Sequence, residues 1–228
     1  MRFILGTDPE TFLSLGGQFV SAHGLFPGTK KEPYKVDKGA IQVDGVALEF
    51  NIDPVDNMVD WNRNIETVLL QMKEMVQKVD KDMILKFEPI ASFDKKYFDN
   101  IPIEAKILGC DPDFNFQGKM NPAPKLQDVP LRTAAGHIHI GWTEGENPNS
   151  ASHFEDARFI SDKFYNSGIF TPKLSSEQER LRYYGMYGSF RPKSYGVELR
   201  SPSNLWVETP ESRMKMFSKV MTQMQELV

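Results

Sequence analysis

The chain has 228 residues, 40% of them hydrophobic and 25% charged, and its formal net charge at pH 7 is −4. This composition is typical of a folded globular protein, and without a cationic excess we expect no non-specific binding to nucleic acids or anionic membranes. No run of about 18 apolar residues exists that would span a membrane, and the single Cys110 excludes an internal disulfide framework. We therefore expect one domain over residues 1–228, located in the cytoplasm.

The first ninety residues favour short strands and one long helix. Gly16-Gly17 separates two β-prone runs as a hairpin turn does, and Asp44-Gly45 offers a second turn. A loop over residues 27–39 carries four lysines. Apolar residues then recur at helical spacing over residues 61–79, which gives a helix with one apolar face. The strands expected here are residues 2–5, 11–15, 18–20, 40–52 and 83–87.

Three further helices are predicted by their capping residues. Ser152 and Glu155 form a capping-box pattern that opens a helix, and Gly168 is placed to end it. A shorter helix is expected from about Ser176. The last helix has Thr209 as N-cap, followed by proline at its first position.

The order of the elements predicts an α+β fold. The proline-rich segment 111–132 is expected as an irregular loop, with strands over residues 133–142 and 195–201 on the far side of it. Strands and helices do not alternate regularly, as they would in a parallel βαβ protein. An antiparallel or mixed sheet is therefore the better interpretation.

Familiar catalytic motifs are absent from the sequence. It contains no G-x-x-x-x-G-K-[ST] loop, no G-x-G-x-x-G turn, no H-E-x-x-H zinc motif and no G-x-S-x-G nucleophile elbow. Any nucleotide site must therefore be built in another way.

Polar residues instead occur two apart within three of the predicted strands. Side chains alternate between the two faces of a strand, so residues two apart share a face. The pairs are Glu49 with Asn51, His137 with His139, and Glu198 with Arg200, each opposite apolar neighbours. Asp8 and Glu10 repeat the spacing, although Pro9 between them indicates a turn or a strand edge.

A solvated outer face of a sheet would show the same alternation. Carboxylates and imidazoles, however, are metal-capable groups, whereas a solvated face tends toward Lys and Thr. Gly136 and Gly141 bracket the histidine pair and would allow phosphates to approach the backbone. We therefore favour a ligand-binding face over a solvated one.

The residue types suit a divalent cation beside an anion. Magnesium prefers carboxylate oxygens, which Glu10, Glu49 and Glu198 offer. Imidazole suits zinc, iron or manganese better, so His137 and His139 leave the metal open.

Cationic residues cluster around the same strands. Arg132, Arg191, Lys193 and Arg200 offer groups that bind phosphate oxygens, and Lys30 lies in a loop that would close over them. For Arg132, Lys193 and Lys30 a surface role is an equally good interpretation.

Five strings occur in an order and spacing that resemble the phage-type amidoligase family, the predicted type 2 carboxylate–amine ligases. The resemblance extends over about residues 3–207, and the family is placed in the glutamine synthetase and glutamate–cysteine ligase superfamily. The strings are GTDPE (6–10), VALEFN (46–51), GCDPDFN (109–115), GHIHIG (136–141) and FRPKSYGVELR (190–200).

The resemblance implies a fold and a set of roles. The fold would be like the glutamine synthetase catalytic domain: a curved antiparallel (mixed) β-sheet with helices on its convex face. ATP and Mg²⁺, or Mn²⁺, would bind on the other face. The resemblance assigns Glu10, Glu49 and Glu198 to the metal, His137 or His139 to a position near the metal and the phosphates, and Arg191 and Arg200 to the transferred phosphoryl group. We take His137 as the fourth metal ligand, and we expect Arg132, Lys193, Asn51 and Lys30 to bind the nucleotide.

The implied reaction joins a carboxylate to an amine through an acyl phosphate and releases ADP and phosphate. His139 and Asp113 are both candidates for the base that takes the proton of the amine. The substrates would be small-molecule, peptide or protein carboxylates and amines, in the host cytoplasm if a phage encodes the chain. The oligomeric state stays open.

Two rival functions fit the same residues. A metal-dependent hydrolase or oxygenase would use His137, His139 and Glu198. A non-catalytic phage interaction protein would keep a ligase-like fold without the activity.

Overall fold

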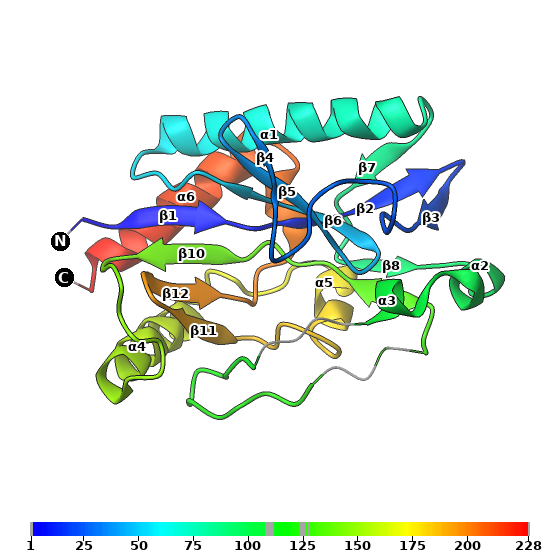
Figure 1. Cartoon of the computed structure of the whole chain (residues 1–228). Helices are drawn as coiled ribbons and strands as arrows, with labels where there is room; N and C mark the ends of the chain where they lie inside the picture. Colours follow the sequence, from blue (N-terminus) through cyan, green and yellow to red (C-terminus); the bar gives the residue numbers. More distant parts are fainter. Residues whose placement is uncertain (1, 108–111, 124–125, 127, 228) are drawn as a thin grey trace.

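The computed structural model describes residues 2–107, 112–123, 126 and 128–227 (Figure 1). The strands are β1 (Ile4–Thr7), β2 (Glu10–Leu15), β3 (Gln18–Val20), β4 (Tyr34–Val36), β5 (Gly39–Asp44), β6 (Ala47–Ile52), β7 (Ile84–Lys86), β8 (Ile90–Ser92), β9 (Leu131–Thr133), β10 (Ile138–Gly141), β11 (Phe190–Lys193) and β12 (Gly196–Leu199). The helices are α1 (Met58–Val79), α2 (Lys95–Asn100), α3 (Ile103–Lys106), α4 (Ala151–Ser167), α5 (Ser175–Arg180), the 3-10 helix η1 (Asn204–Val207) and α6 (Pro210–Gln225). None of the helices in these ranges is both long enough and apolar enough to cross a membrane.

The strands form three sheets, and every pairing between them in the described part of the chain is antiparallel. A four-stranded sheet has the order β1-β10-β12-β11, and a six-stranded sheet has the order β3-β2-β6-β5-β4 with β7 beside β2. Strands β8 and β9 pair by themselves. The α+β class and the antiparallel pairing are confirmed, whereas the strands are divided among three sheets instead of one.

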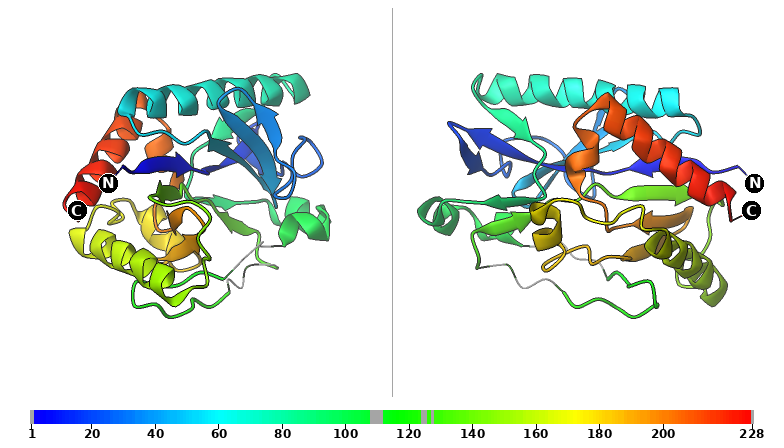
Figure 2. Two further views of the ribbon diagram at one scale, coloured as in Figure 1. Left: turned by 60° about the vertical axis from the view of Figure 1, so that its left-hand side comes forward. Right: turned by 180° about the vertical axis from the view of Figure 1, so that it is seen from behind.

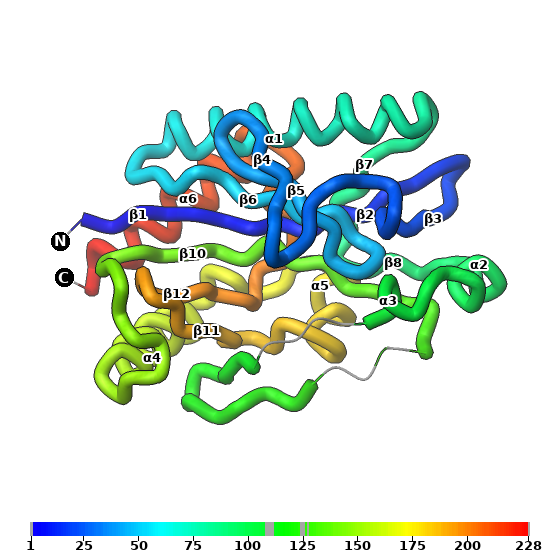
Figure 3. Tube along the Cα trace, viewed as in Figure 1, coloured from blue at the N-terminus to red at the C-terminus, as the bar shows by residue number. Residues whose placement is uncertain are grey.

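The two larger sheets meet where β1 runs into β2 through Asp8 and Pro9. There the amide of Glu10 donates to the carbonyl of Ala135 at 2.9 Å, and the amide of Phe50 donates to the carbonyl of Pro9 at 3.1 Å. Figure 3 shows β1 and β10 running side by side through the middle of the molecule, although more than a hundred residues separate them in the chain. The polar pairs of both sheets are therefore brought to one place.

Helices cover the apolar faces of these sheets. Helix α1 packs on β5 and β6 and against α6, and α4 packs on β11 and β12 (Figure 2). Trp61 of α1 stacks on Trp206 of η1 with ring centroids 5.6 Å apart. Ile138, Ile140 and Val197 are fully buried in the same hydrophobic core, which leaves the opposite side of their strands to the polar pairs.

Most predicted elements are present with small shifts in their bounds. The turn at Gly16-Gly17, the long helix and the last helix are confirmed, and Thr209 caps α6 by accepting a hydrogen bond from the amide of Ser212. Gly168 ends α4 with a φ of 69°. The capping box at Ser152 is wrong, because α4 begins after Ser150, whose side chain makes no capping hydrogen bond.

The strand predicted over residues 133–142 divides into two. Its start, β9, pairs with β8, whereas β10 pairs with β1 and β12. The chain changes sheets at Gly136, where a Cβ atom would lie only 2.6 Å from Nε1 of Trp206, so the backbone approaches that ring too closely for a side chain. The periodicity of apolar residues in the sequence does not reveal such a close contact between backbone and side chain.

The predicted loops hold elements that the patterns missed. Strand β4 lies within the loop 27–39, and β8, β11, α2 and α3 were not predicted. The string Gly109-Cys110-Asp111 lies outside the described residues.

Candidate functional site

The register of the four-stranded sheet places its polar residues opposite one another. His139 lies opposite Gly6 of β1 and Glu198 of β12, and Arg191 of β11 also lies opposite Glu198. The imidazoles and Glu198 therefore share one face, as their spacing predicts.

Two histidines and two carboxylates form what we name the histidine centre: Asp8, His137, His139 and Glu198. Oδ1 of Asp8 lies 3.1 Å from Nδ1 of His137 and 2.9 Å from Nε2 of His139. Nδ1 of His137 lies 3.5 Å from Oε1 of Glu198. Ligand atoms of Asp8, His139 and Glu198 all lie within 4.8 Å of one another, which is close enough for one metal ion to bind them.

Three cationic side chains converge on Glu198, which is only 1% exposed. Nζ of Lys193 lies 2.9 Å and Nη1 of Arg191 lies 3.2 Å from its Oε2 atom, and Nη1 of Arg200 contacts Oε1. Arg200 also donates from Nε to Asp113 at 3.0 Å. A buried carboxylate with this many donors is held in its ionised form.

The pKa values of the histidine centre follow from these charges. Burial alone would raise the pKa of Asp8, but His139 and His137 hold it well below its usual range. Burial likewise opposes the charge of Glu198, yet His137, His139 and Lys193 lower its pKa. The pKa of His139 is raised by Asp8 against the effect of burial, whereas burial and Arg200 lower that of His137.

Three further acids form what we name the carboxylate centre: Glu10, Asp44 and Glu49. Glu10 and Glu49 lie opposite each other on β2 and β6, and their ligand atoms and those of Asp44 are all within 4.8 Å of one another. Oε2 of Glu10 accepts a hydrogen bond of 2.7 Å from the amide of Ala135. Nζ of Lys30 lies 2.8 Å from Oδ2 of Asp44.

The carboxylate centre has the opposite electrostatic balance. Burial and the charge of Asp44 raise the pKa of Glu10 to about 7. Burial and the charges of Asp8, Glu10 and Asp44 raise the pKa of Glu49 well above its usual value. Oxygen ligands in a buried acidic cluster fit a hard divalent cation, which would replace the protons that the raised pKa values retain.

A cavity of about 680 Å³ adjoins both centres. This volume lies within the range of about 300–1,000 Å³ typical of small-molecule sites. Asp8 and His139 of the histidine centre and Glu49 of the carboxylate centre line it, together with Tyr195. The hydroxyl of Tyr195 contacts Nδ1 of His139. The remaining lining residues include the polar side chains of Lys30, Gln42 and Asn51 and the apolar ones of Ile4, Pro54 and Trp142.

Most of the residues selected from the sequence are brought together. Glu10, Glu49, His137, His139, Glu198, Arg191, Lys193 and Arg200 belong to the two centres or contact them, and Asn51 and Lys30 line the cavity. The carboxylates are distributed over two centres, however, and Glu198 belongs to a different centre from Glu10 and Glu49.

Two of the selected residues, Arg132 and Asp113, belong to neither centre and do not line the large cavity, although Arg132 lines a smaller one of about 50 Å³ together with Glu10 and Asp44. Arg132 is buried and donates to the carbonyls of Leu126 and Val129 at 2.9 Å and of Lys106 at 2.8 Å, so its guanidinium holds the backbone of the irregular segment. Asp113 accepts from Arg200 and from Asn121, and it is not among the residues that line the large cavity.

Sequence reasoning did not select Asp8, Asp44, Tyr195 or Arg180. Asp44 carried a usable signal, because it lies two residues from Gln42, which faces Glu49 directly across the hairpin. Asp8 also carried a signal, because it shares the two-residue spacing with Glu10, and its carboxylate lies between the two histidines. Tyr195 lies within the string over residues 190–200, whereas no sequence pattern points to Arg180, whose charge partly offsets the rise in the pKa of Glu10.

Comparison with known proteins adds little. No protein-family model matches the sequence, and no curated protein is significantly similar to it. Among solved structures, the chain is similar to the crystal structure of a bifunctional glutathione synthetase from Pasteurella multocida, with 11% identity and a TM-score of 0.45. The similarity covers 97% of this chain and 38% of the glutathione synthetase chain, so this chain spans less than half the length of that protein. A similarity of this size carries no argument about activity.

Proposed function

We propose that the protein is an ATP- and magnesium-dependent carboxylate–amine ligase of the phage-type amidoligase family. The observation that carries the proposal is the presence of two different centres at one cavity: three close carboxylates in one, and a carboxylate with three cations around it in the other. Phosphoryl transfer needs both a metal on the polyphosphate and positive side chains near the moving group. The order of the five sequence strings supports the same proposal.

The metal would be held by carboxylate oxygens. Glu10, Asp44 and Glu49 would bind Mg²⁺, or Mn²⁺ with the same ligand type. When bound, the ion neutralises the phosphate charge of ATP.

The reaction has two steps. An oxygen of the substrate carboxylate attacks the γ-phosphorus of ATP, the bond to ADP breaks, and an acyl phosphate forms. The amine nitrogen then attacks the acyl carbon, phosphate leaves, and the amine loses a proton. Arg191, Lys193 and Arg200 would stabilise negative charge on the transferred group.

His139 is the better of the two candidate bases. It lines the cavity and contacts both Asp8 and Tyr195, whereas Asp113 is engaged by Arg200. Its raised pKa strengthens it as a proton acceptor. Its neutral form is needed, so we expect turnover to rise with pH through that pKa.

The test is the identity of the nucleotide product. Pooled carboxylates and amines are incubated with ATP and Mg²⁺, condensation is detected by mass spectrometry, and phosphorus NMR identifies the products. We expect ADP and phosphate, with turnover strongly reduced in Arg200→Lys, which keeps the charge and loses the bidentate geometry. AMP and pyrophosphate as products would contradict the acyl-phosphate route.

A second candidate function is supported by the histidine centre. Both imidazoles lie within 3.1 Å of Asp8, and Nε2 of His137 is buried without a hydrogen-bond partner in the described part of the chain. A metal-dependent hydrolase or oxygenase would use these groups. Stoichiometric zinc or iron on the purified protein, without any effect of ATP on its melting temperature, would favour that function.

A further inference from the structure

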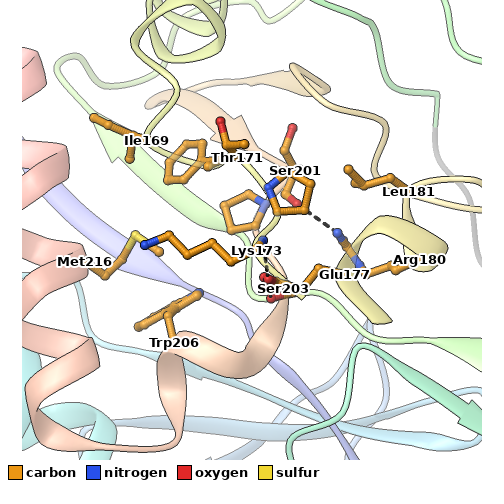
Figure 4. Close-up of a pocket in the computed structure, with 13 residues that line it drawn as sticks. Ile169, Thr171, Lys173, Glu177, Arg180, Leu181, Ser201, Ser203, Trp206 and Met216 are labelled. Carbon is orange, nitrogen blue, oxygen red and sulfur yellow. Dashed lines mark hydrogen bonds between the residues drawn. The ribbon is translucent and has the colours of Figure 1, made fainter. Parts of the chain in front are cut away.

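A second cavity of about 130 Å³ lies between α5, η1 and α6, next to the segment that follows α4 (Figure 4). None of the described residues lines both this cavity and the large one. Figure 4 shows Lys173 extending across the cavity toward Met216, with Arg180 on the opposite side. We name it the α5 cavity.

Arg180 gives the α5 cavity a buried positive wall. The side chain is 1% exposed and donates from Nη1 to the carbonyl of Ser201 at 2.8 Å and from Nη2 to that of Arg200 at 3.2 Å. Its Nε atom is buried and has no hydrogen-bond partner among the described residues. A buried guanidinium donor without an acceptor is costly, so an acceptor supplied by a ligand would be favoured here.

Lysines give the mouth of the cavity a positive charge. Lys173 lines the cavity and is exposed. Burial lowers the pKa of Lys219 on α6, and the charges of Lys173 and Lys215 lower it further.

Glu177 is the one acid among the described residues that line the cavity, and both of its carboxylate oxygens already accept hydrogen bonds. Oε1 of Glu177 accepts from Oγ of Ser203 at 2.6 Å, and Oε2 accepts from the amides of Lys173 at 2.9 Å and Leu174 at 3.1 Å. Its acceptor oxygens are therefore already used within the chain, and among the described lining residues the two cations Arg180 and Lys173 outnumber this one acid.

The remaining wall is apolar. Phe170, Trp206 and Met216 line the cavity beside the charged groups. An apolar cavity of about 150 Å³ accepts benzene, so about six non-hydrogen atoms fit in a volume of this size. The ligand must then combine a short apolar body with a compact negative group.

We propose that the α5 cavity is a binding site for a small organic carboxylate. The carboxylate would accept a hydrogen bond from Arg180, and the hydrocarbon part would lie against Trp206 and Met216. The ammonium of Lys173, which extends toward Met216, would add positive charge at the other side of the cavity. The site is separate from the proposed ligase chemistry, and its existence does not depend on that function.

A ligand in this site would touch two side chains that support the functional strands from behind. Arg180 holds the carbonyl of Arg200, and Nε1 of Trp206 donates to the carbonyl of Gly136 at 3.0 Å, next to His137. A ligand in the α5 cavity would therefore reduce the motion of the backbone at His137 and Arg200.

Butyrate, with six non-hydrogen atoms, is the probe, and butyramide is its neutral counterpart. We expect butyrate at millimolar concentration and constant ionic strength to raise the melting temperature and to change tryptophan emission in a saturable way, whereas butyramide does neither. Lys173→Met should weaken the affinity about threefold to fivefold, the value of an exposed charge pair. Lys78→Met on α1 removes the same charge far from the cavity and should change nothing.

A second variant tests the volume. Met216→Phe fills the cavity from a half-buried position and should abolish the response to butyrate while the folded spectrum is retained. An equal response to butyramide, an equal loss in Lys78→Met, or no saturable response in the wild type would overturn the proposal.

Discussion

The histidine centre and the carboxylate centre adjoin the same cavity and both contain buried or half-buried acids, yet the pKa values of these acids are shifted in opposite directions. The pKa values of Asp8 and Glu198 are lowered, whereas those of Glu10 and Glu49 are raised. Burial raises the pKa of a carboxyl group in every one of these cases, so burial does not explain the difference. Direct contact with cationic partners explains the lowered pKa values, and repulsion from neighbouring acids adds to burial in the raised ones.

The two centres differ in how the negative charge of their acids is balanced. Glu198 is in contact with Lys193, Arg191 and Arg200, and the histidine centre is neutralised by the chain itself. In the carboxylate centre, Lys30 faces three acids that repel one another. The acids of the first centre are paired with cations of the chain, whereas those of the second need a bound cation or protons.

The largest expected effect is the loss of Glu198. Glu198→Gln leaves three cations around a neutral amide, and removing one partner of a buried charge pair costs about 3–5 kcal/mol in the free energy of unfolding. Chemical denaturation measures it. The matched control is Glu155→Gln on α4, which breaks an exposed pair with Arg158 and should cost about 0.5 kcal/mol or less. Equal losses in both variants would contradict the electrostatic account of Glu198.

In the carboxylate centre, the loss of a carboxylate should raise the free energy of unfolding instead of lowering it. Glu49→Gln removes a repelled charge without a change in shape, so the metal-free protein should gain about 1 kcal/mol in the free energy of unfolding at pH 8. Glu74→Gln on the exposed side of α1 is the control. A loss of stability as large as that of Glu198→Gln would show that Glu49 is a paired charge after all.

The pH dependence sharpens the same contrast. A carboxyl with a raised folded-state pKa contributes stability that is present below its unfolded value and is lost as the pH rises through the folded value. Glu10, with a pKa of about 7, and Glu49 should thus make the metal-free protein less stable as the pH rises from about 5 to 8. Asp8 and Glu198, whose pKa values are lowered, lose their contribution only as the pH falls below about 4. Thermal melts should show a smaller slope above pH 5 in Glu49→Gln, and an unchanged slope would contradict the assignment.

The smallest expected effect concerns Lys30. Its ammonium lies against Asp44 where a metal would bind, so Lys30→Met should strengthen the binding of Mg²⁺ in the absence of nucleotide by about threefold. Calorimetric titration measures the affinity, and the exposed neighbouring Lys31 gives the control Lys31→Met. Weaker binding in Lys30→Met would mean that the lysine supports the metal site instead of competing with it.

Alternation of polar and apolar residues predicted the shared faces correctly. Glu198 with Arg200, and His137 with His139, do lie together, because strand geometry fixes which side chains share a face. It also predicted that Ile138 and Ile140 face the core. What it does not contain is the sheet order, so it placed Glu198 with Glu10 and Glu49, whereas the register joins it to His139 and Arg191.

The residues that were missed depend on contacts across the fold. Arg180 reaches the backbone of Arg200 from a helix whose position is set by the packing around it. Arg132 has the residue type of a phosphate-binding group, but its donors are used by backbone carbonyls of a segment that no periodicity predicts. Residue type and spacing identify candidate residues. Only the tertiary contacts show whether such a residue is free to bind a ligand or holds the backbone in place.

The central claim is that the carboxylate centre is a divalent-cation site beside a cavity for ATP, and Mn²⁺ binding followed by electron paramagnetic resonance tests it most directly. The account predicts binding at pH 8 that Mg²⁺ displaces, that weakens strongly at pH 5.5 as Glu10 and Glu49 take up protons, and that is lost in Glu49→Gln. Binding that is unchanged in Glu49→Gln, or no binding at either pH, would contradict it.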